Sequence, residues 1–131
     1  MVFANNPQEQ SLALGDMVVL DLTDDKGMYM GKMLADMGAD VIKIEKFEGG
    51  DDIRRSGPPF INGEAAAFLG INRNKRSIVL NLKSQDGLEI ARRLLGDADV
   101  FVQNLRPGSA DRLGLGYDEL HQLNPALVYC T

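Results

Sequence analysis

The sequence contains a single cysteine, Cys130, among its 131 residues. A disulfide framework needs paired cysteines and a thiolate zinc site needs several, so neither is expected, and no other metal is implied. No apolar run approaches the ~18–20 residues that cross a bilayer. Residues 1–10 lack the basic start and apolar core of a secretory signal. We therefore expect a cytoplasmic protein that does not associate with a membrane.

Basic residues are in the minority. Fourteen Lys and Arg stand against nineteen Asp and Glu, which leaves a net charge of −5. Proteins that bind nucleic acid usually carry an excess of basic charge, so we expect no nucleic-acid partner. Hydrophobic residues make up 44% and charged residues 25%, close to the average of globular domains. The length fits one domain or a part of a larger one.

Short aliphatic segments alternate with segments of helical periodicity after residues 1–14, which are polar and predict a flexible leader. Strands are predicted over 17–22, 41–45, 77–82, 99–103 and 127–130. Helices are predicted over 28–37, 64–70 and 85–95, then after Ser109 and over 117–123. This alternation predicts an α/β fold with a Rossmann-like, mostly parallel sheet and helices on both faces. Because the chain stops at the carboxyl end of a predicted strand, we expect it to be a fragment.

Cap residues and apolar spacing define the predicted helices. Ser84 and Ser109 are placed to cap two of them, and Gly38 suits the left-handed end of the first. Before that first helix stand three further cap types, Thr23, Asp24 and Asp25. The same helix carries an apolar stripe that we expect in the core: Met30, Met33, Leu34 and Met37.

The turn after the first strand offers little support for a dinucleotide site. A Rossmann fingerprint needs three glycines, and this turn has only Gly27 and Gly31. Glu45 ends the second strand, where an acid that binds a ribose would stand. One acid alone is weak support for NAD binding. Elsewhere, the lone His121 has no identifiable catalytic partner, and Cys130 is interpreted as an apolar filler.

Two segments could bind anions. The run 72–77 carries Arg73, Lys75 and Arg76, which could hold phosphates, although such charge runs more often form solvated turns. The turn 104–109 precedes a helix that carries Arg112, and the N–H groups at the start of that helix could accept an anion. This second segment is equally explained as a strand-to-helix turn shaped by Pro and Gly.

The loop 46–62 is long and rich in Gly, Pro and charge, which is typical of functional loops.

Taken together, these segments resemble the class III coenzyme A transferases, the family of formyl-CoA transferase, carnitine CoA-transferase and 2-methylacyl-CoA racemase. The likeness covers nearly everything after Leu14, in order and at the expected spacing. The stretches that carry it are 19–23, 34–45, 50–55, 57–60, 72–77, 104–108, 112–117 and 123–125.

The resemblance implies that residues 15–131 are the N-terminal portion of a large domain that binds CoA along the carboxyl edge of its sheet. It implies acyl-CoA and a carboxylic acid as substrates, and a homodimer of interlocked chains. By position, Lys46 matches a basic residue near the CoA phosphates, and the stretch from Leu80 to Lys83 matches the surroundings of the adenine and 3′-phosphate. The remaining matched positions are Asn104, Leu105 and Arg112.

Two features depart from the family pattern. The turn after the first strand lacks the usual Arg or His, a cation that Lys26 could replace, and Leu105 stands where an aromatic residue is usual. The resemblance implies that the catalytic aspartate of the family lies beyond the position that matches Thr131. We therefore expect no catalytic residue here and no turnover by this chain alone. An acyl-CoA racemase of the same family, or a stand-alone non-catalytic nucleotide-binding or interaction module, remains an alternative.

Overall fold

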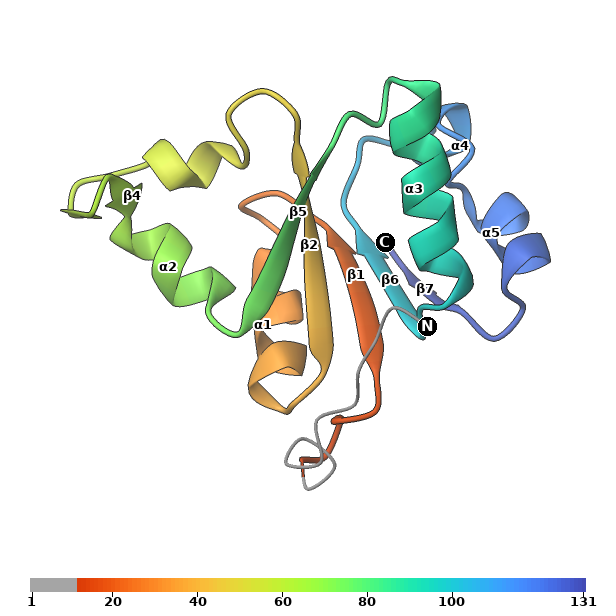
Figure 1. Cartoon of the computed structure of the whole chain (residues 1–131), viewed down its shortest axis with the longest axis horizontal. Coiled ribbons are helices and arrows are strands. Elements are labelled where there is room, and N and C mark those ends of the chain that lie inside the picture. The colour runs from red at the N-terminus through yellow and green to blue at the C-terminus, as the bar shows by residue number, and fades with distance from the viewer. Residues whose placement is uncertain (1–11) are drawn as a thin grey trace.

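A five-stranded parallel sheet forms the centre of the computed structural model, which describes residues 12–131 (Figure 1). Its strands in chain order are β1 (Val18–Leu22), β2 (Asp40–Lys46), β5 (Lys75–Leu80), β6 (Val100–Gln103) and β7 (Val128–Cys130). They lie in the order β5-β2-β1-β6-β7, and every ladder is parallel. This is the strand order of a doubly wound fold, so the predicted Rossmann-like α/β class is confirmed.

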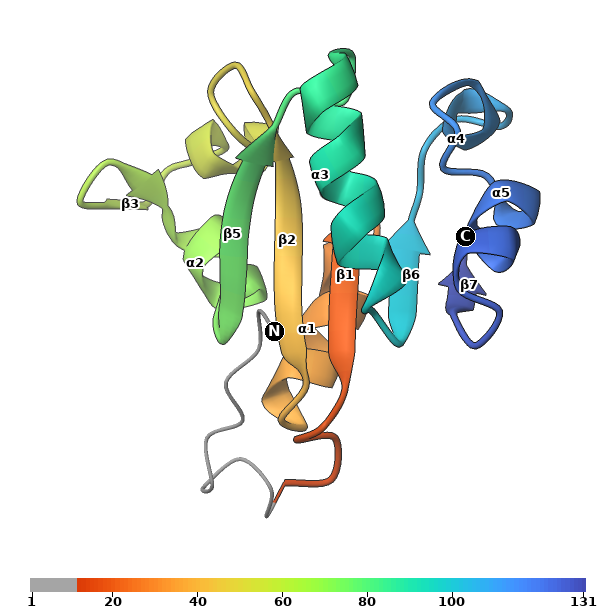
Figure 2. The same ribbon diagram turned by 45° about the vertical axis from the view of Figure 1, so that its right-hand side comes forward.

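Helices cover both faces of the sheet (Figures 1 and 2). On one side lie α1 (Met28–Asp36) and, beside it, α2 (Ala66–Asn72). On the other side lie α3 (Gln85–Gly96), α4 (Ser109–Arg112) and α5 (Tyr117–Leu123). The flexible leader predicted over 1–14 falls mainly outside the described residues. Within them, the Leu14 N–H donates to the Met37 carbonyl at 3.1 Å.

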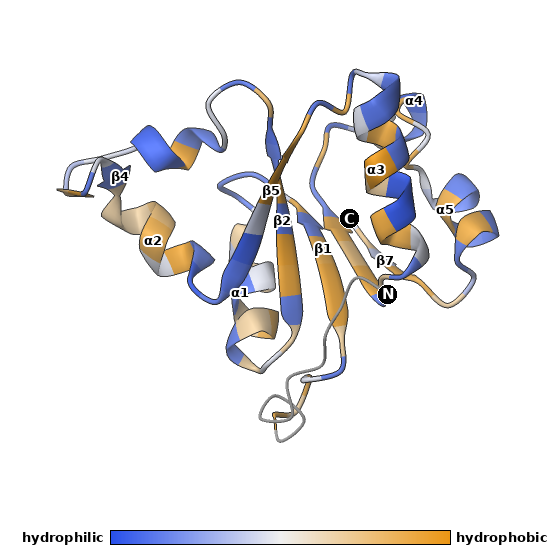
Figure 3. Ribbon diagram, viewed as in Figure 1, coloured by the Kyte–Doolittle hydropathy of each residue, from blue (hydrophilic) through white to orange (hydrophobic). Residues whose placement is uncertain are grey.

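Alternation along the strands divides the apolar interior into two clusters. Val18 and Leu20 of β1 face the α3 side, whereas Val19 faces the α1 side. A strand that is buried on both faces needs apolar side chains at consecutive positions. This explains why the central strands are so apolar (Figure 3). The α3-side cluster is the larger one and includes Phe101 and Leu95, both fully buried.

The predicted core face of α1 was largely wrong. Met30, Met33 and Met37 are 41%, 47% and 42% exposed, and of that stripe only Leu34 packs against the core. The residues that α1 buries are Met28, Gly31 and Ala35. Two of these are small, because α1 approaches the sheet closely at a buried carboxylate: a Cβ on Gly31 would lie 2.4 Å from Asp21 Oδ2.

The predicted caps were partly confirmed. Ser84 Oγ accepts from the Gly87 N–H at 3.2 Å, and Gly38 has the expected positive φ of 106°. The N-cap of α1, however, is Gly27, and the N-cap of α4 is Gly108 rather than Ser109; neither makes a side-chain cap bond. None of the three predicted cap residues occupies the N-cap position of α1. The Asp24 carboxylate, for example, instead accepts from the Lys26 N–H and from Asn104 Nδ2.

The loop predicted over 46–62 has internal structure. It contains a 3-10 helix, η2 (Asp52–Arg55), and the strand β3 (Phe60–Ile61), which pairs antiparallel with β4 (Glu64–Ala65). This hairpin occupies the start of the predicted helix 64–70, so α2 begins at Ala66. The strand predicted over 77–82 is also displaced, because Lys75 and Arg76 are neutralised by Asp21 and Asp40 and enter β5.

Candidate functional site

A cavity of about 470 Å³ lies where β1, β2 and β5 end. This is the carboxyl edge of the sheet, where open α/β folds bind their ligands. Its walls are chiefly aliphatic, and its polar lining residues are Lys46, Lys83, Asn81, Glu45 and Glu48. The aliphatic residues come from three strands and from the segment after β6: Leu22, Ile44, Leu80, Leu82, Leu105 and Leu113.

Four of the seven predicted site residues line this carboxyl-edge cavity together: Lys46, Leu80, Lys83 and Leu105. Lys46 and Lys83 are exposed, whereas Leu80 is 7% exposed. Lys46 Nζ lies 2.6 Å from Asp52 Oδ1, and this contact lowers the pKa of Asp52. Exposed ion pairs contribute little free energy, so Lys46 can exchange Asp52 for an anionic ligand at small cost.

The other three predicted residues do not line the cavity. The Asn104 side chain binds the β1–α1 turn: Oδ1 accepts from the Asp24 N–H at 3.0 Å, and Nδ2 donates to Asp24 Oδ1. Lys26 lies in the same turn, and its N–H donates to that carboxylate, which lowers the pKa of Asp24. Arg112 lies in α4 and donates to Ser109 Oγ at 2.8 Å.

The contact between Asp24 and Asn104 joins the ends of two neighbouring strands, β1 and β6. The connection from β1 runs to β2 on one side, and β6 lies on the other side of β1, so this is the topological switch point of the sheet. Asp24 and Asn104 occupy the switch point with their mutual hydrogen bonds. The cavity lies next to it, at the carboxyl ends of β2 and β5.

The basic run 72–77 contains an exposed turn at Arg73 and Asn74, as the solvated-turn interpretation predicted, but Lys75 departs from that interpretation because its side chain is buried at the start of β5. Arg73 Nη2 lies 2.9 Å from Asp36 Oδ2, and Arg76 pairs with Asp40. Lys75 is buried, with a side chain 1% exposed, and donates to Asp21 Oδ2 at 2.8 Å. Burial lowers the pKa of Lys75, while the charge of Asp21 opposes that shift. Each of the three cations thus pairs with an aspartate from β1, α1 or β2, and only the Lys75–Asp21 pair is buried.

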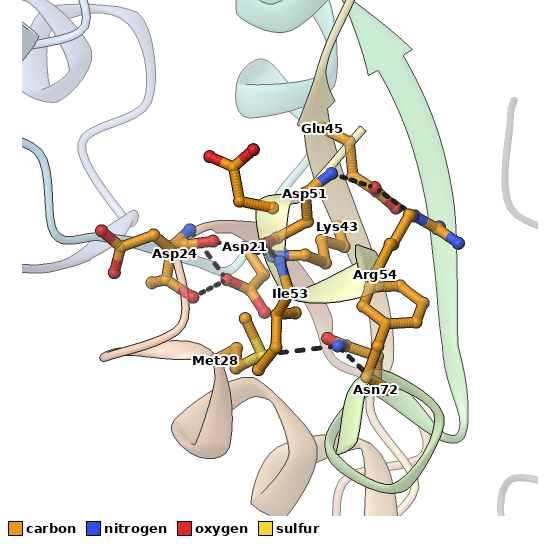
Figure 4. A network of polar contacts seen from close by, with 12 residues as sticks. Asp21, Asp24, Met28, Lys43, Glu45, Asp51, Ile53, Arg54 and Asn72 are labelled. Atoms are coloured by element: carbon orange, nitrogen blue, oxygen red, sulfur yellow. Dashed lines mark hydrogen bonds and ion pairs between the residues drawn. The ribbon is translucent and has the colours of Figure 1, made fainter. Parts of the chain in front are cut away.

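A second group of buried charges lies on the α1 side of β2 (Figure 4). Lys43 Nζ lies 2.9 Å from Asp51 Oδ2 and donates to the Thr23 carbonyl at 2.7 Å. Glu45, 3% exposed, accepts from Arg54. Burial alone would raise the pKa of Glu45, but hydrogen bonds from Arg54, Ser77 Oγ and the Asp51 N–H lower it to about 2.

Sequence reasoning did not identify this charge group, although a signal was present. Lys43 and Glu45 alternate with aliphatic residues in β2, so both must lie on one face of a buried strand. A buried charge requires a partner, and the charged loop that follows supplies Asp51 and Arg54. Sequence reasoning also missed the cavity residues Leu22, Ile44 and Leu113, whose aliphatic character does not distinguish them from the core.

Among residues 12–131, no helix has the length and apolar character needed to cross a bilayer. The same part of the chain contains no group of three or more His, Cys, Asp or Glu side chains placed to hold a metal ion.

A family model for CoA-transferase family III matches residues 14–131. The chain belongs to this family. It is 44% identical over 114 residues to a mouse succinyl-CoA:glutarate CoA-transferase, and the matched region covers 86% of this chain and 26% of the mouse protein. It is 49% identical over 111 residues to a succinate–glutarate CoA-transferase of Agrobacterium fabrum, which covers 80% of this chain and 28% of that protein.

Among solved structures, the family III chain is similar to a CAIB/BAIF family protein from Brucella suis. The TM-score is 0.86 at 42% sequence identity, and the match covers 91% of this chain and 32% of the Brucella chain. The family III chain thus spans about a quarter of the length of the two curated relatives and about a third of that solved structure.

Proposed function

We propose that this chain is the CoA-binding segment of an enzyme that transfers coenzyme A between carboxylic acids through acyl-CoA thioesters. The observation that carries the proposal is the carboxyl-edge cavity, which combines an aliphatic wall with two exposed lysines, Lys46 and Lys83. Membership of CoA-transferase family III supports the reaction class. The proposal includes a homodimeric, cytoplasmic enzyme with acyl-CoA and a carboxylic acid as substrates.

The chemistry of CoA fits the two kinds of surface in this cavity. The adenine ring can be packed against aliphatic side chains such as Leu80 and Leu105, and the phosphates need cations. Lys46 and Lys83 come from the ends of β2 and β5, which are neighbouring strands. An acidic protein can still bind a polyanion when cations gather locally at the site.

The proposal places the nucleophilic carboxylate of the reaction outside residues 12–131. A carboxylate nucleophile must be able to reach the thioester carbonyl carbon, where a C–O bond forms as the C–S bond breaks. The products are a mixed anhydride and the CoA thiolate. The two buried carboxylates among residues 12–131 are already held: Asp21 by Lys75 and Thr23, and Glu45 by Arg54. Bound in this way, neither is available as a nucleophile. This segment therefore supplies binding and orientation.

Calorimetric titration of the full-length protein with CoA tests the proposal. We expect Lys83→Ala and Lys46→Ala each to weaken CoA binding by about tenfold, since a charge-assisted contact contributes roughly 1–3 kcal/mol. Arg93→Ala is the matched control, because Arg93 is an exposed cation of α3 that does not line this cavity. Unchanged affinity in both lysine variants would remove the site assignment.

A further inference from the structure

Glu45 lies at the cavity, and its carboxylate binds the loop that follows β2. Glu45 and the three residues after it, Lys46 to Glu48, line the cavity. The chain then reverses at two glycines with positive φ, 77° at Gly49 and 68° at Gly50. A Cβ on Gly50 would lie 2.7 Å from Glu45 Oε2, so the returning chain passes directly against the Glu45 carboxylate.

The returning chain is fastened to that carboxylate by Arg54 and Asp51. Arg54 Nε donates to Glu45 Oε2 at 2.7 Å and Arg54 Nη2 to Oε1 at 2.6 Å, while the Asp51 N–H donates to Oε2 at 2.8 Å. The bidentate geometry fixes orientation as well as distance. Segment 46–50 is therefore a closed loop with both ends fixed at Glu45.

The Arg54 guanidinium is itself held from the other side. Its centre lies 3.9 Å from the centroid of the Phe68 ring in α2, and Nη1 lies 3.2 Å from Glu64 Oε2 in β4. That Glu64 oxygen is buried and has no hydrogen-bond partner among the described residues, so Arg54 supplies its nearby positive charge. Arg54 thus connects the hairpin and α2 to the end of β2 (Figure 4).

We propose that Arg54 is a positioning residue for CoA binding: through Glu45 it holds segment 46–48 in the conformation that forms one wall of the cavity. Arg54 does not itself line the cavity. The proposal rests on the proposed function, because its readout is CoA affinity. Its physical basis is that a misplaced wall loses contacts with a ligand even when the contacting side chains are unchanged.

The test compares Arg54→Ala and Arg54→Lys with Arg73→Ala in the full-length protein. Arg73 is a matched control, since it also pairs with a carboxylate through Nε and Nη2, at 3.1 and 2.9 Å, and does not line the cavity. CoA affinity is measured by calorimetry, and hydrogen exchange reports the Asp51 amide. We expect Arg54→Ala to raise the Kd by about tenfold with faster exchange at Asp51, and Arg73→Ala to change neither.

Arg54→Lys keeps the charge but cannot form the planar fork, so we expect a smaller rise in Kd with the same change in exchange. If Arg54→Ala does not fold, Arg54→Lys decides the outcome. A folded Arg54 variant that binds CoA as tightly as the unmodified protein would overturn the proposal, as would weaker binding with unchanged exchange at Asp51. Failure of the unmodified protein to bind CoA would instead contradict the proposed function itself.

Discussion

Lys75 and Asp21 form an ion pair that is removed from solvent: Nζ lies 2.8 Å from Oδ2, and the two side chains are 1% and 0% exposed. Lys75 also donates to the Met28 carbonyl and to Asn72 Oδ1, and Asp21 accepts from Thr23 Oγ1. The pair joins β1 and β5, which flank β2, beneath α1. Each charge therefore depends on the other for compensation.

Removing one partner of this pair leaves an uncompensated buried charge. We expect Asp21→Asn to lower the free energy of unfolding by about 3–5 kcal/mol, as measured by urea denaturation at neutral pH. Asp52→Asn is the control, because Asp52 forms only exposed pairs with Lys46 and Arg55, and we expect it to cost less than about 1 kcal/mol. Equal losses in the two variants would contradict the importance assigned to the buried pair.

The close approach of α1 to the sheet requires glycine at position 31. A Cβ there would meet Asp21 Oδ2 at 2.4 Å and Lys75 Nζ at 3.1 Å. Although alanine favours helix, we expect Gly31→Ala to destabilise the protein by roughly 1–3 kcal/mol, measured as a fall in the urea midpoint. Gly70→Ala in α2 has open space around the new methyl group and should be neutral or stabilising. A stable Gly31→Ala protein would show that α1 can shift outward without cost.

The Glu45 carboxylate makes stability depend on acid pH. Its pKa in the folded protein, about 2, lies below its ordinary value of 4.5. The ionised Glu45 carboxylate therefore contributes fully to the free energy of unfolding above pH 4.5, and this contribution is lost as the pH falls toward 2. We expect this loss to be on the order of 2–3 kcal/mol in urea unfolding series across that window.

Glu45→Gln supplies the comparison for this acid dependence. Glutamine cannot titrate, so the variant should be less stable at neutral pH and should lose less stability between pH 4.5 and 2. An acid dependence as steep in Glu45→Gln as in the unmodified protein would assign the loss to other carboxylates.

Arg112 and Lys83 should differ in their effects on CoA binding. Arg112 donates to Ser109 Oγ and does not line the cavity, whereas Lys83 does. We expect Arg112→Ala to weaken CoA binding less than Lys83→Ala, because the attraction between exposed charges is screened with distance. Calorimetry on both variants measures the difference. A loss in Arg112→Ala equal to that in Lys83→Ala would mean that the ligand also extends across α4.

The architecture could be predicted because alternation of strands and helices restricts the topology. Short aliphatic runs identified the five strands of the sheet, and the right-handed crossover rule made their ladders parallel. The α1 stripe shows where this reasoning stops. Periodicity shows that Met30, Met33 and Met37 share a face, but not that α1 instead meets the sheet through Met28, Gly31 and Ala35.

The gathering of two predicted cations at one cavity could be expected for a related reason. Lys46 ends β2 and Lys83 lies three residues after β5, so the parallel topology brings both to one edge of the sheet. The partner of Lys75 lies 54 residues away in the chain, and no local pattern indicates such a pair. The alternation in β2 indicates that Glu45 needs a partner, but it does not identify Arg54, 9 residues away, as that partner. Asn104 stays a predicted CoA contact, and the sequence did not indicate that its side chain binds Asp24 across the switch point.

A crystal structure of the full-length protein with bound CoA tests the central claim most directly. The account predicts that the nucleotide part of CoA occupies the cavity at the carboxyl edge, with its phosphates at Lys46 and Lys83 and its adenine against Leu80 and Leu105. A second groove, of about 490 Å³, lies between α3 and α5 and includes Arg92 and Arg93. CoA bound in that groove, with the carboxyl-edge cavity empty, would contradict the account.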